Sequence, residues 1–347
     1  MEELYTIKYN QVTASVRGET RMRRKDIWRP WTAALAVALG TLSAVPSGAA
    51  EQVTLGTVGQ ASANIWPVLI ALDQGFYGAE DLKVDLVYVQ SSAALVQQVT
   101  AGSLPVSIST GLADPLRAVG MGAPVSIARI EVQLPPYDLV AKPSIGSLAD
   151  LKGKLISLGG PKDITRIYVE RMLAPNGVKP GDFDMVFAGA TAARASALAA
   201  GAVDAAILLP AFNFQAIAKG FKSLGLTATY VKDLPFSGVS VNNAWASANK
   251  PLLEKLLRVE TKSIAWFNDS KNQADAIRIL KTASALSEDD VQKAYTFFRD
   301  GNFFEPTGKV SRAKLDNLAK AMESLGDLPG ALDVGKAVMP GVAQMTD

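Results

Sequence analysis

Short apolar runs alternate with amphipathic stretches along most of this chain, and this alternation limits the possible folds more than any other feature. Strands that alternate with helices at this spacing predict parallel sheets covered by helices, which is an α/β fold. The strands are expected at 53–58, 84–89, 106–109, 125–128, 154–158, 185–187 and 205–209, and the helices at 64–74, 93–101, 112–119, 163–173, 192–200 and 212–219. After residue 249 the pattern is helical to the end of the chain.

The alternation occurs twice, which predicts two similarly built lobes. Leu55-Gly56 in the first series matches Leu158-Gly159 in the second by residue type. The segment 100–108 likewise matches 199–207, including the glycine that ends each helix. Chance similarity between two Ala- and Gly-rich helix ends is the alternative. The shared order of elements favours two like-built lobes, each a mostly parallel sheet flanked by helices.

Two extended segments, 134–143 and 236–241, stand between the two series, each beside proline or glycine. If the chain crosses between the lobes at both, these strands form a hinge and the lobes enclose a cleft. We therefore expect a discontinuous first lobe, 51–138 with 240–347, and a second lobe at 139–239.

The first fifty residues have the three-part pattern of a secretory signal peptide. A basic segment at 22–29 precedes an apolar run at 33–45, and small residues lead to Ala50. The apolar run is too short for a membrane anchor, which needs about 20 residues. We expect residues 1–50 to be a signal peptide cleaved near Ala50, with Met22 as an alternative start. The mature protein is then expected in the periplasm, and the pattern leaves the export route open.

The chain of 347 residues contains no cysteine and no histidine. It therefore has no disulfides, no Cys or His zinc site, no Ser-His-Asp triad and no thiol nucleophile. Its formal net charge of +2 argues against a nucleic-acid partner. We expect a monomeric protein with no catalytic residue, no metal and no cofactor.

Ligands of open parallel sheets bind at the carboxyl ends of the strands. Here small, hydroxyl and amide residues follow the strands, several of them at helix starts whose free N–H groups suit an anion. For any one Ser or Thr, a plain helix cap is the alternative. The candidate ligand-binding residues are Gln60, Asn64, Trp66, Ser91, Ser92, Ser109, Thr110, Gly159, Gly160, Thr165, Arg166, Thr191, Phe212 and Asn213.

Three of these candidates have a more specific expected role. Arg166 is the candidate clamp for a carboxylate or sulfonate, with a solvated helix position as its alternative. Trp66 and Phe212 could form apolar walls, although core packing is the alternative for Trp66. Arg129 either faces the cleft or forms a structural ion pair.

Three segments resemble the solute-binding proteins of nitrate-, sulfonate- and taurine-type ABC importers, relatives of the thiamine-pyrimidine binding proteins. They are 66–76, 147–157 and 200–206, with the sequences WPVLIALDQGF, SLADLKGKLIS and AGAVDAA. Two positions depart from the family pattern: Leu209 replaces a frequent acidic residue, and Pro105 occupies the first-lobe counterpart of Asp204.

The resemblance implies a two-lobe periplasmic-binding-protein fold of the type II kind and a function in import. The protein would capture a small anionic solute, a sulfonate or carboxylate, and deliver it to a membrane permease and ATPase. A thiamine-pyrimidine-like or aromatic precursor is the alternative solute. A ligand-sensing domain is another reading. Enzymes on the same fold, a desulfinase and a pyrimidine synthase, depend on Cys or His, which this chain lacks.

Overall fold

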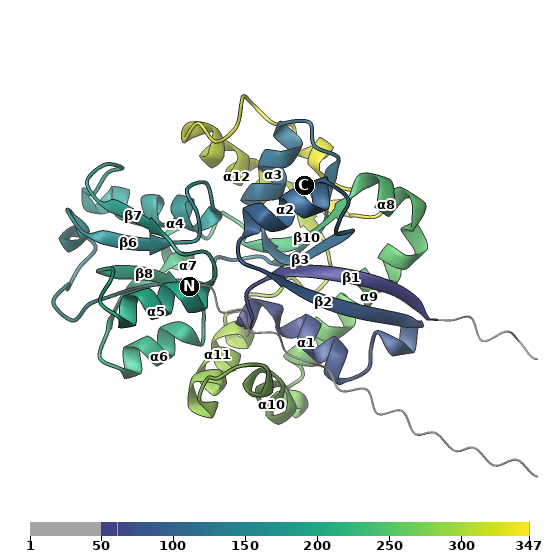
Figure 1. Cartoon of the computed structure of the whole chain (residues 1–347), viewed down its shortest axis with the longest axis horizontal. Coiled ribbons are helices and arrows are strands. Elements are labelled where there is room, and N and C mark those ends of the chain that lie inside the picture. Colours follow the sequence, from purple (N-terminus) through teal and green to yellow (C-terminus); the bar gives the residue numbers. More distant parts are fainter. Residues whose placement is uncertain (1–49, 61, 347) are drawn as a thin grey trace, which may run out of the picture. The chain divides into compact units, whose positions relative to one another are not determined.

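The computed structural model describes residues 50–60 and 62–346 (Figure 1). The predicted signal peptide lies outside these residues except for Ala50, so its cleavage stays a prediction. No helix in the described ranges is long and apolar enough to cross a membrane.

The described residues contain two five-stranded sheets, each of which mixes parallel and antiparallel strands. The first sheet has the order β2-β1-β3-β10-β4 and the second the order β7-β6-β8-β5-β9. The first sheet consists of β1 (Glu51–Val58), β2 (Leu82–Val89), β3 (Val106–Gly111), β4 (Val125–Val132) and β10 (Ser237–Asn242). The second consists of β5 (Asp138–Ala141), β6 (Leu155–Leu158), β7 (Asp184–Phe187), β8 (Ala205–Leu208) and β9 (Lys222–Leu226).

The two crossing segments become the antiparallel strand of each sheet. β5 follows β4 but pairs with β8 and β9 in the second sheet, whereas β10 returns to pair with β3 and β4 in the first. A strand that arrives from the other sheet enters from the opposite end, so β10 and β5 each run against the other four strands of their sheet. Each sheet is therefore mostly parallel, as expected, with one antiparallel strand. The lobe boundaries themselves stay a prediction.

The register refines the internal repeat. Leu55 pairs with Val106 in the first sheet, and Ile156 pairs with Ala205 in the second. Leu55 therefore corresponds to Ile156, two residues before the Leu158 that residue type suggested. The match of segment 100–108 to 199–207 agrees with the register, since it aligns Val106 with Ala205.

Helices cover the sheets and fill the carboxyl-terminal part (Figure 1). They are α1 (Trp66–Asp73), α2 (Ser92–Thr100), α3 (Ala113–Gly120), α4 (Ile164–Leu173), α5 (Thr191–Ala199), α6 (Phe212–Ala218), α7 (Thr227–Tyr230), α8 (Asn243–Ala248), α9 (Lys250–Asn268), α10 (Gln273–Ala283), α11 (Glu288–Asp300) and α12 (Arg312–Ser324). A short pair, β11 (Val310–Ser311) and β12 (Met345–Thr346), interrupts the helical pattern expected after residue 249.

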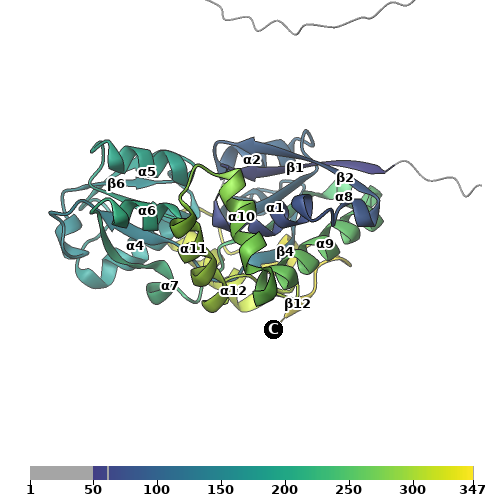
Figure 2. The ribbon, with the colours of Figure 1, turned by 90° about the horizontal axis from the view of Figure 1, so that it is seen from below.

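The carboxyl-terminal helices α10 and α11 contact elements of both sheets. α10 lies beside α1, where the Trp66 indole nitrogen donates a 2.7 Å hydrogen bond to the Ala276 carbonyl oxygen (Figure 2). α11 lies beside α6, with the rings of Phe297 and Phe214 6.2 Å apart. The apolar core is correspondingly continuous between the two sheets. In this arrangement the strand ends of both sheets face one cavity.

Candidate functional site

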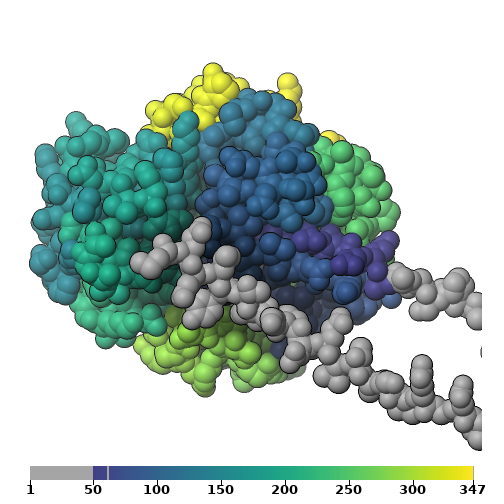
Figure 3. Space-filling model, in the orientation of Figure 1, coloured from purple at the N-terminus to yellow at the C-terminus, as the bar shows by residue number. Residues whose placement is uncertain are grey.

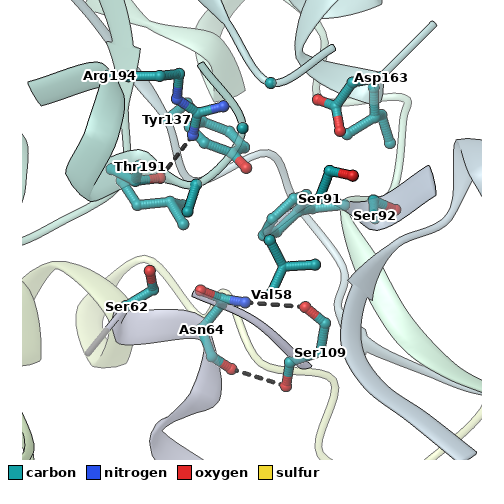
Figure 4. A pocket seen from close by; sticks show the side chains of 17 residues that line it. Val58, Ser62, Asn64, Ser91, Ser92, Ser109, Tyr137, Asp163, Thr191 and Arg194 are labelled. Atoms are coloured by element: carbon teal, nitrogen blue, oxygen red, sulfur yellow. Dashed lines mark hydrogen bonds between the residues drawn. The ribbon is translucent and has the colours of Figure 1, made fainter. Parts of the chain in front are cut away.

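A cavity of about 50 Å³ lies between the strand ends of the two sheets (Figure 4). Its wall comes from residues in or just after the last residues of β1, β2 and β3 in the first sheet and of β6, β7 and β8 in the second, together with the two crossing segments. The lining residues are Val58, Ser62, Asn64, Ser91, Ser92, Ser109, Gly111, Tyr137, Gly159, Asp163, Ile164, Gly189, Ala190, Thr191, Arg194, Leu209 and Phe236.

Arg194 brings a buried positive charge to this cavity. It lies in the first turn of α5, its residue is 3% exposed, and its Nη2 donates to Thr191 Oγ1 at 2.6 Å. Its Nε is buried without a hydrogen-bond partner. No carboxylate of the described residues pairs with the guanidinium. A buried cation without a counter-charge is costly, so this arrangement favours an anionic ligand.

Tyr137 and Phe236 are the aromatic residues of the two crossing segments. Each directly precedes its crossing strand, β5 or β10, and their rings meet edge to face at 5.0 Å. The guanidinium carbon of Arg194 lies 5.4 Å from the centre of the Tyr137 ring. Burial raises the pKa of Tyr137, so its hydroxyl remains a protonated donor that points into the cavity (Figure 4).

Ser109, in the second half of β3, forms the floor of the cavity. Its φ of +53° lies in the left-handed region, which is unusual for a residue other than glycine. Three hydrogen bonds hold it there: Asn64 Nδ2 donates to its carbonyl, its Oγ donates to the Asn64 carbonyl, and its N–H donates to Glu131 Oε2 at 2.6 Å. Strain held by several contacts is common at binding sites.

Glu131 and Glu260 form a fully buried pair of carboxyl groups beneath Ser109. Burial raises the pKa of Glu131 to about 8, and the negative charge of Glu260 adds to the rise while nearby Arg129 opposes it. Burial likewise raises the pKa of Glu260 to about 7, opposed by Arg129 and by the hydroxyl of Tyr77, which donates to Glu260 Oε1. The folded protein therefore holds a proton on this pair at neutral pH.

Asp163 supplies the carboxylate of the cavity, on the side away from Arg194 and beside Ser91 and Ser92 (Figure 4). It caps α4 by accepting from the Thr165 N–H at 2.9 Å and from the Thr165 hydroxyl at 2.5 Å. Thr165 Oγ1 in turn accepts from the Gly159 N–H at 3.0 Å. The cavity thus has a positive end and a negative end.

Six of the predicted site residues line this cavity, and the others lie elsewhere. The cavity residues are Asn64, Ser91, Ser92, Ser109, Gly159 and Thr191. Gln60 is exposed to solvent, and the Thr110 hydroxyl donates a hydrogen bond to the Ile108 carbonyl. The Thr165 hydroxyl donates to Asp163 in the helix cap described above. Gly160 lines a second cavity nearby.

The predicted apolar walls lie behind the cavity. Trp66 is fully buried between Phe267 and Tyr295, with ring centres at 5.2 and 6.0 Å. Phe212 packs against the core, and the Asn213 side-chain amide donates to Asp138 at 3.3 Å. These three side chains lie on helix faces that pack against the rest of the protein, so none of them reaches the cavity.

The predicted clamp Arg166 is engaged outside the cavity. Its Nε donates to Glu170 Oε1 at 2.8 Å, its Nη1 donates to the Pro161 carbonyl, and Asp327 lies 4.0 Å away. Arg129 is also buried on the far side of the first sheet, where it donates to the carbonyls of Leu257 and Glu305. The arginine that lines the cavity is Arg194, which the sequence analysis did not select.

Glycine allows the two sheets to approach closely at the cavity. Gly189, after β7, has a φ of +70°, and a β-carbon there would lie 2.6 Å from the carbonyl oxygen of Gln90, after β2. A β-carbon at Gly59 would lie 3.0 Å from that of Ala190. In the space-filling view the blue surface of α2 and α3 meets the teal surface of the second sheet's elements (Figure 3). The two sheets therefore approach each other closely beside the cavity.

Comparison with known proteins identifies the family. The sequence profile described as "NMT1/THI5 like" matches residues 62–274, more than half of the chain. The chain belongs to this family. No curated protein sequence matches it significantly.

Solved structures share the fold at low identity. The alkanesulfonate-binding protein SsuA from Xanthomonas axonopodis pv. citri, bound to MOPS, is 17% identical with a TM-score of 0.69 over 85% of this chain and 98% of that one. The periplasmic nitrate-binding protein NrtA from Synechocystis PCC 6803 is 16% identical with a TM-score of 0.70 over 84% and 86%. The desulfurization enzyme DszB is 14% identical with a TM-score of 0.62 over 84% and 97%. These likenesses confirm the periplasmic-binding-protein fold, and that fold also occurs in an enzyme.

Proposed function

We propose that this protein is the solute-binding component of an ABC importer and that it binds a small organic anion, a sulfonate or carboxylate, between its two sheets. The observation that carries this proposal is Arg194, a buried cation that lines the cavity with an unpartnered Nε and no carboxylate partner among the described residues. A ligand oxygen at Nε would supply the missing acceptor in a site of low dielectric, where such a hydrogen bond is strong.

The start of α5 supports the same ligand. This helix begins at Thr191 without a side-chain cap, so its first N–H groups and partial positive charge face the cavity end that holds Arg194. The hydroxyl of Tyr137 adds a neutral donor. Together these groups form a concave set of donors that fits an oxyanion.

The binding cycle follows from the two crossing strands. The wall residues come from both sheets, so a ligand contacts all of them only when the sheets approach as they do here. A ligand stabilises the closed form by its higher affinity for that form. We propose that the closed, loaded protein then releases its solute to a membrane permease driven by an ATPase, after export to the periplasm.

The rival function is an enzyme on the same fold, as DszB illustrates. The cavity offers Asp163 and Tyr137 as its ionisable groups besides Arg194, and the chain has no cysteine or histidine. These residues suit recognition better than nucleophilic chemistry.

Calorimetry of the purified protein with ethanesulfonate, acetate, nitrate and an aminopyrimidine tests the proposal. We expect one site per chain for an organic anion, with the probe recovered unchanged in proton NMR spectra after a day of incubation. Binding of the aminopyrimidine alone, binding of none of the probes, or their multiple-turnover conversion would each refute it.

A further inference from the structure

A second cavity of about 370 Å³ adjoins the first, and the two share four wall residues. We refer to the first as the head chamber and to the second as the outer chamber. The shared residues, Ser91, Ser92, Gly159 and Asp163, form the neck between them. The outer chamber is completed by Ala93, Asp114, Arg117, Gly160, Pro161, Lys162 and Phe187.

The head chamber is too small for an organic solute of more than a few heavy atoms. Its volume of about 50 Å³ corresponds to roughly three water-sized groups. One sulfonate or carboxylate group fills it, so the remainder of a larger ligand must leave through the neck. Ligand sites that bury an entire organic molecule usually have about 300 Å³ or more, which the outer chamber provides.

The charges fix the direction in which such a ligand enters. Arg194 lies in the head chamber and Asp163 in the neck, so an anionic group is favoured inside and disfavoured where the ligand passes through. The outer chamber carries charges of both signs, because Asp114 pairs there with Arg117 and Lys162 also lines the wall. Burial and the charge of Asp163 raise the pKa of Asp114 to about 6. Arg194, in contrast, has no carboxylate partner among the described residues and keeps an unpartnered Nε, so the anionic head of a ligand is favoured in the head chamber.

Phe187 gives the outer chamber an apolar surface. It ends β7, and 46% of its surface is exposed, which is unusual for phenylalanine. Ala93 and Pro161 add apolar wall beside it. An aliphatic or aromatic group that covers Phe187 would remove its apolar surface from water, and this burial would contribute favourable free energy to binding.

We propose that the solute is an elongated organic anion: its head occupies the head chamber, and an apolar body of several carbons passes the neck and covers Phe187. This inference rests on the proposed function and deepens it by naming the ligand's shape. It makes Phe187 a determinant of chain-length specificity and separates the solute from inorganic anions and from compact organic ones.

Calorimetry with two homologous series of probes tests this inference. The series are the alkanesulfonates from methane- to hexanesulfonate and the alkanoates from acetate to heptanoate. We expect the affinity in at least one series to rise about fourfold for each methylene that enters the outer chamber.

Two variants test whether Phe187 causes the dependence of affinity on chain length. Phe187→Ala should weaken hexanesulfonate or heptanoate by about tenfold and leave the shortest member within twofold. Ile217→Ala is the matched control, because Ile217 is an exposed apolar residue, 38% accessible, that lines neither chamber. It should leave every affinity unchanged.

Two outcomes separate this inference from the proposed function. If the shortest anion binds but affinity is independent of length in both series and of Phe187, the elongated ligand is refuted while the anion site stands. If no member of either series binds the wild-type protein, both proposals fail.

Discussion

Replacement of Arg194 by glutamine should abolish most of the protein's affinity for an organic anion while leaving the fold intact. Glutamine keeps a donor near Thr191 but removes the charge and the Nε–H that lies buried without an acceptor. A hydrogen bond to a charged group contributes about 1.5–3 kcal/mol. With the lost charge attraction we expect a weakening of about 3 kcal/mol, which is about 150-fold.

The ligand-free variant has a distinct signature. Arg194 is buried beside Tyr137 without a carboxylate partner in the described part of the chain, so its removal relieves an uncompensated charge. The melting temperature of ligand-free Arg194→Gln should therefore equal or exceed that of the wild type. A loss of affinity without a loss of stability separates a binding role from a structural one.

Isothermal titration with ethanesulfonate and calorimetric melting of the same samples measure both effects. Arg171→Gln is the matched control, because Arg171 pairs with Asp233 on the surface and lies outside both chambers. It should bind within twofold of the wild type. If Arg194→Gln also binds ethanesulfonate within threefold of the wild type, Arg194 is not the anion's partner and the reasoning fails.

Three further predictions concern stability, closure and processing. Because the pKa values of Glu131 and Glu260 are raised, the folded protein keeps protons that the unfolded chain releases above about pH 4.5. The free energy of unfolding should therefore fall between pH 5 and pH 8.5, by about 1.4 kcal/mol or more, when it is measured by denaturant titration. Glu131→Gln should flatten this profile, and a flat wild-type profile would contradict the buried shared proton. Gly189→Ala should weaken ethanesulfonate binding at least tenfold, because the new β-carbon would collide with the Gln90 carbonyl. Gly177→Ala introduces the same left-handed backbone strain where the β-carbon meets no other atom, so it should leave binding unchanged. Equal effects of the two variants in titration would refute the closure argument. Amino-terminal sequencing of periplasmic protein should begin at Glu51, and retention of residues 1–50 would disprove the signal peptide.

The fold was largely predictable because it depends on hydrophobic periodicity. Each of the seven strands and six helices expected before residue 220 is present within a few residues of its predicted bounds. β9, at 222–226, was missed because its sequence KSLGL has neither clear alternation nor β-branched residues. The antiparallel pairing of β5 and β10 was missed because direction depends on where a strand comes from, which local sequence does not encode.

The site was only partly predictable. The sequence shows where strands end, but it does not show in which direction each side chain near a strand end points. Ser91 and Thr191 line the cavity because they begin helices at strand ends, whereas Trp66 turns into the core on the opposite face of its helix. The choice between Arg166 and Arg194 had a usable signal. Arg166 has an acidic residue, Glu170, one turn later, whereas Arg194 has none at helical spacing. The cation without a local partner is the one that reaches the cavity.

A crystal structure of the protein with hexanesulfonate tests the central claim most directly. The account predicts an unaltered ligand between the two sheets, with a sulfonate oxygen within hydrogen-bond distance of Arg194 Nε and its alkyl chain against Phe187. A sulfonate bound elsewhere, or one in this cavity that leaves Arg194 Nε without a ligand contact, would contradict it.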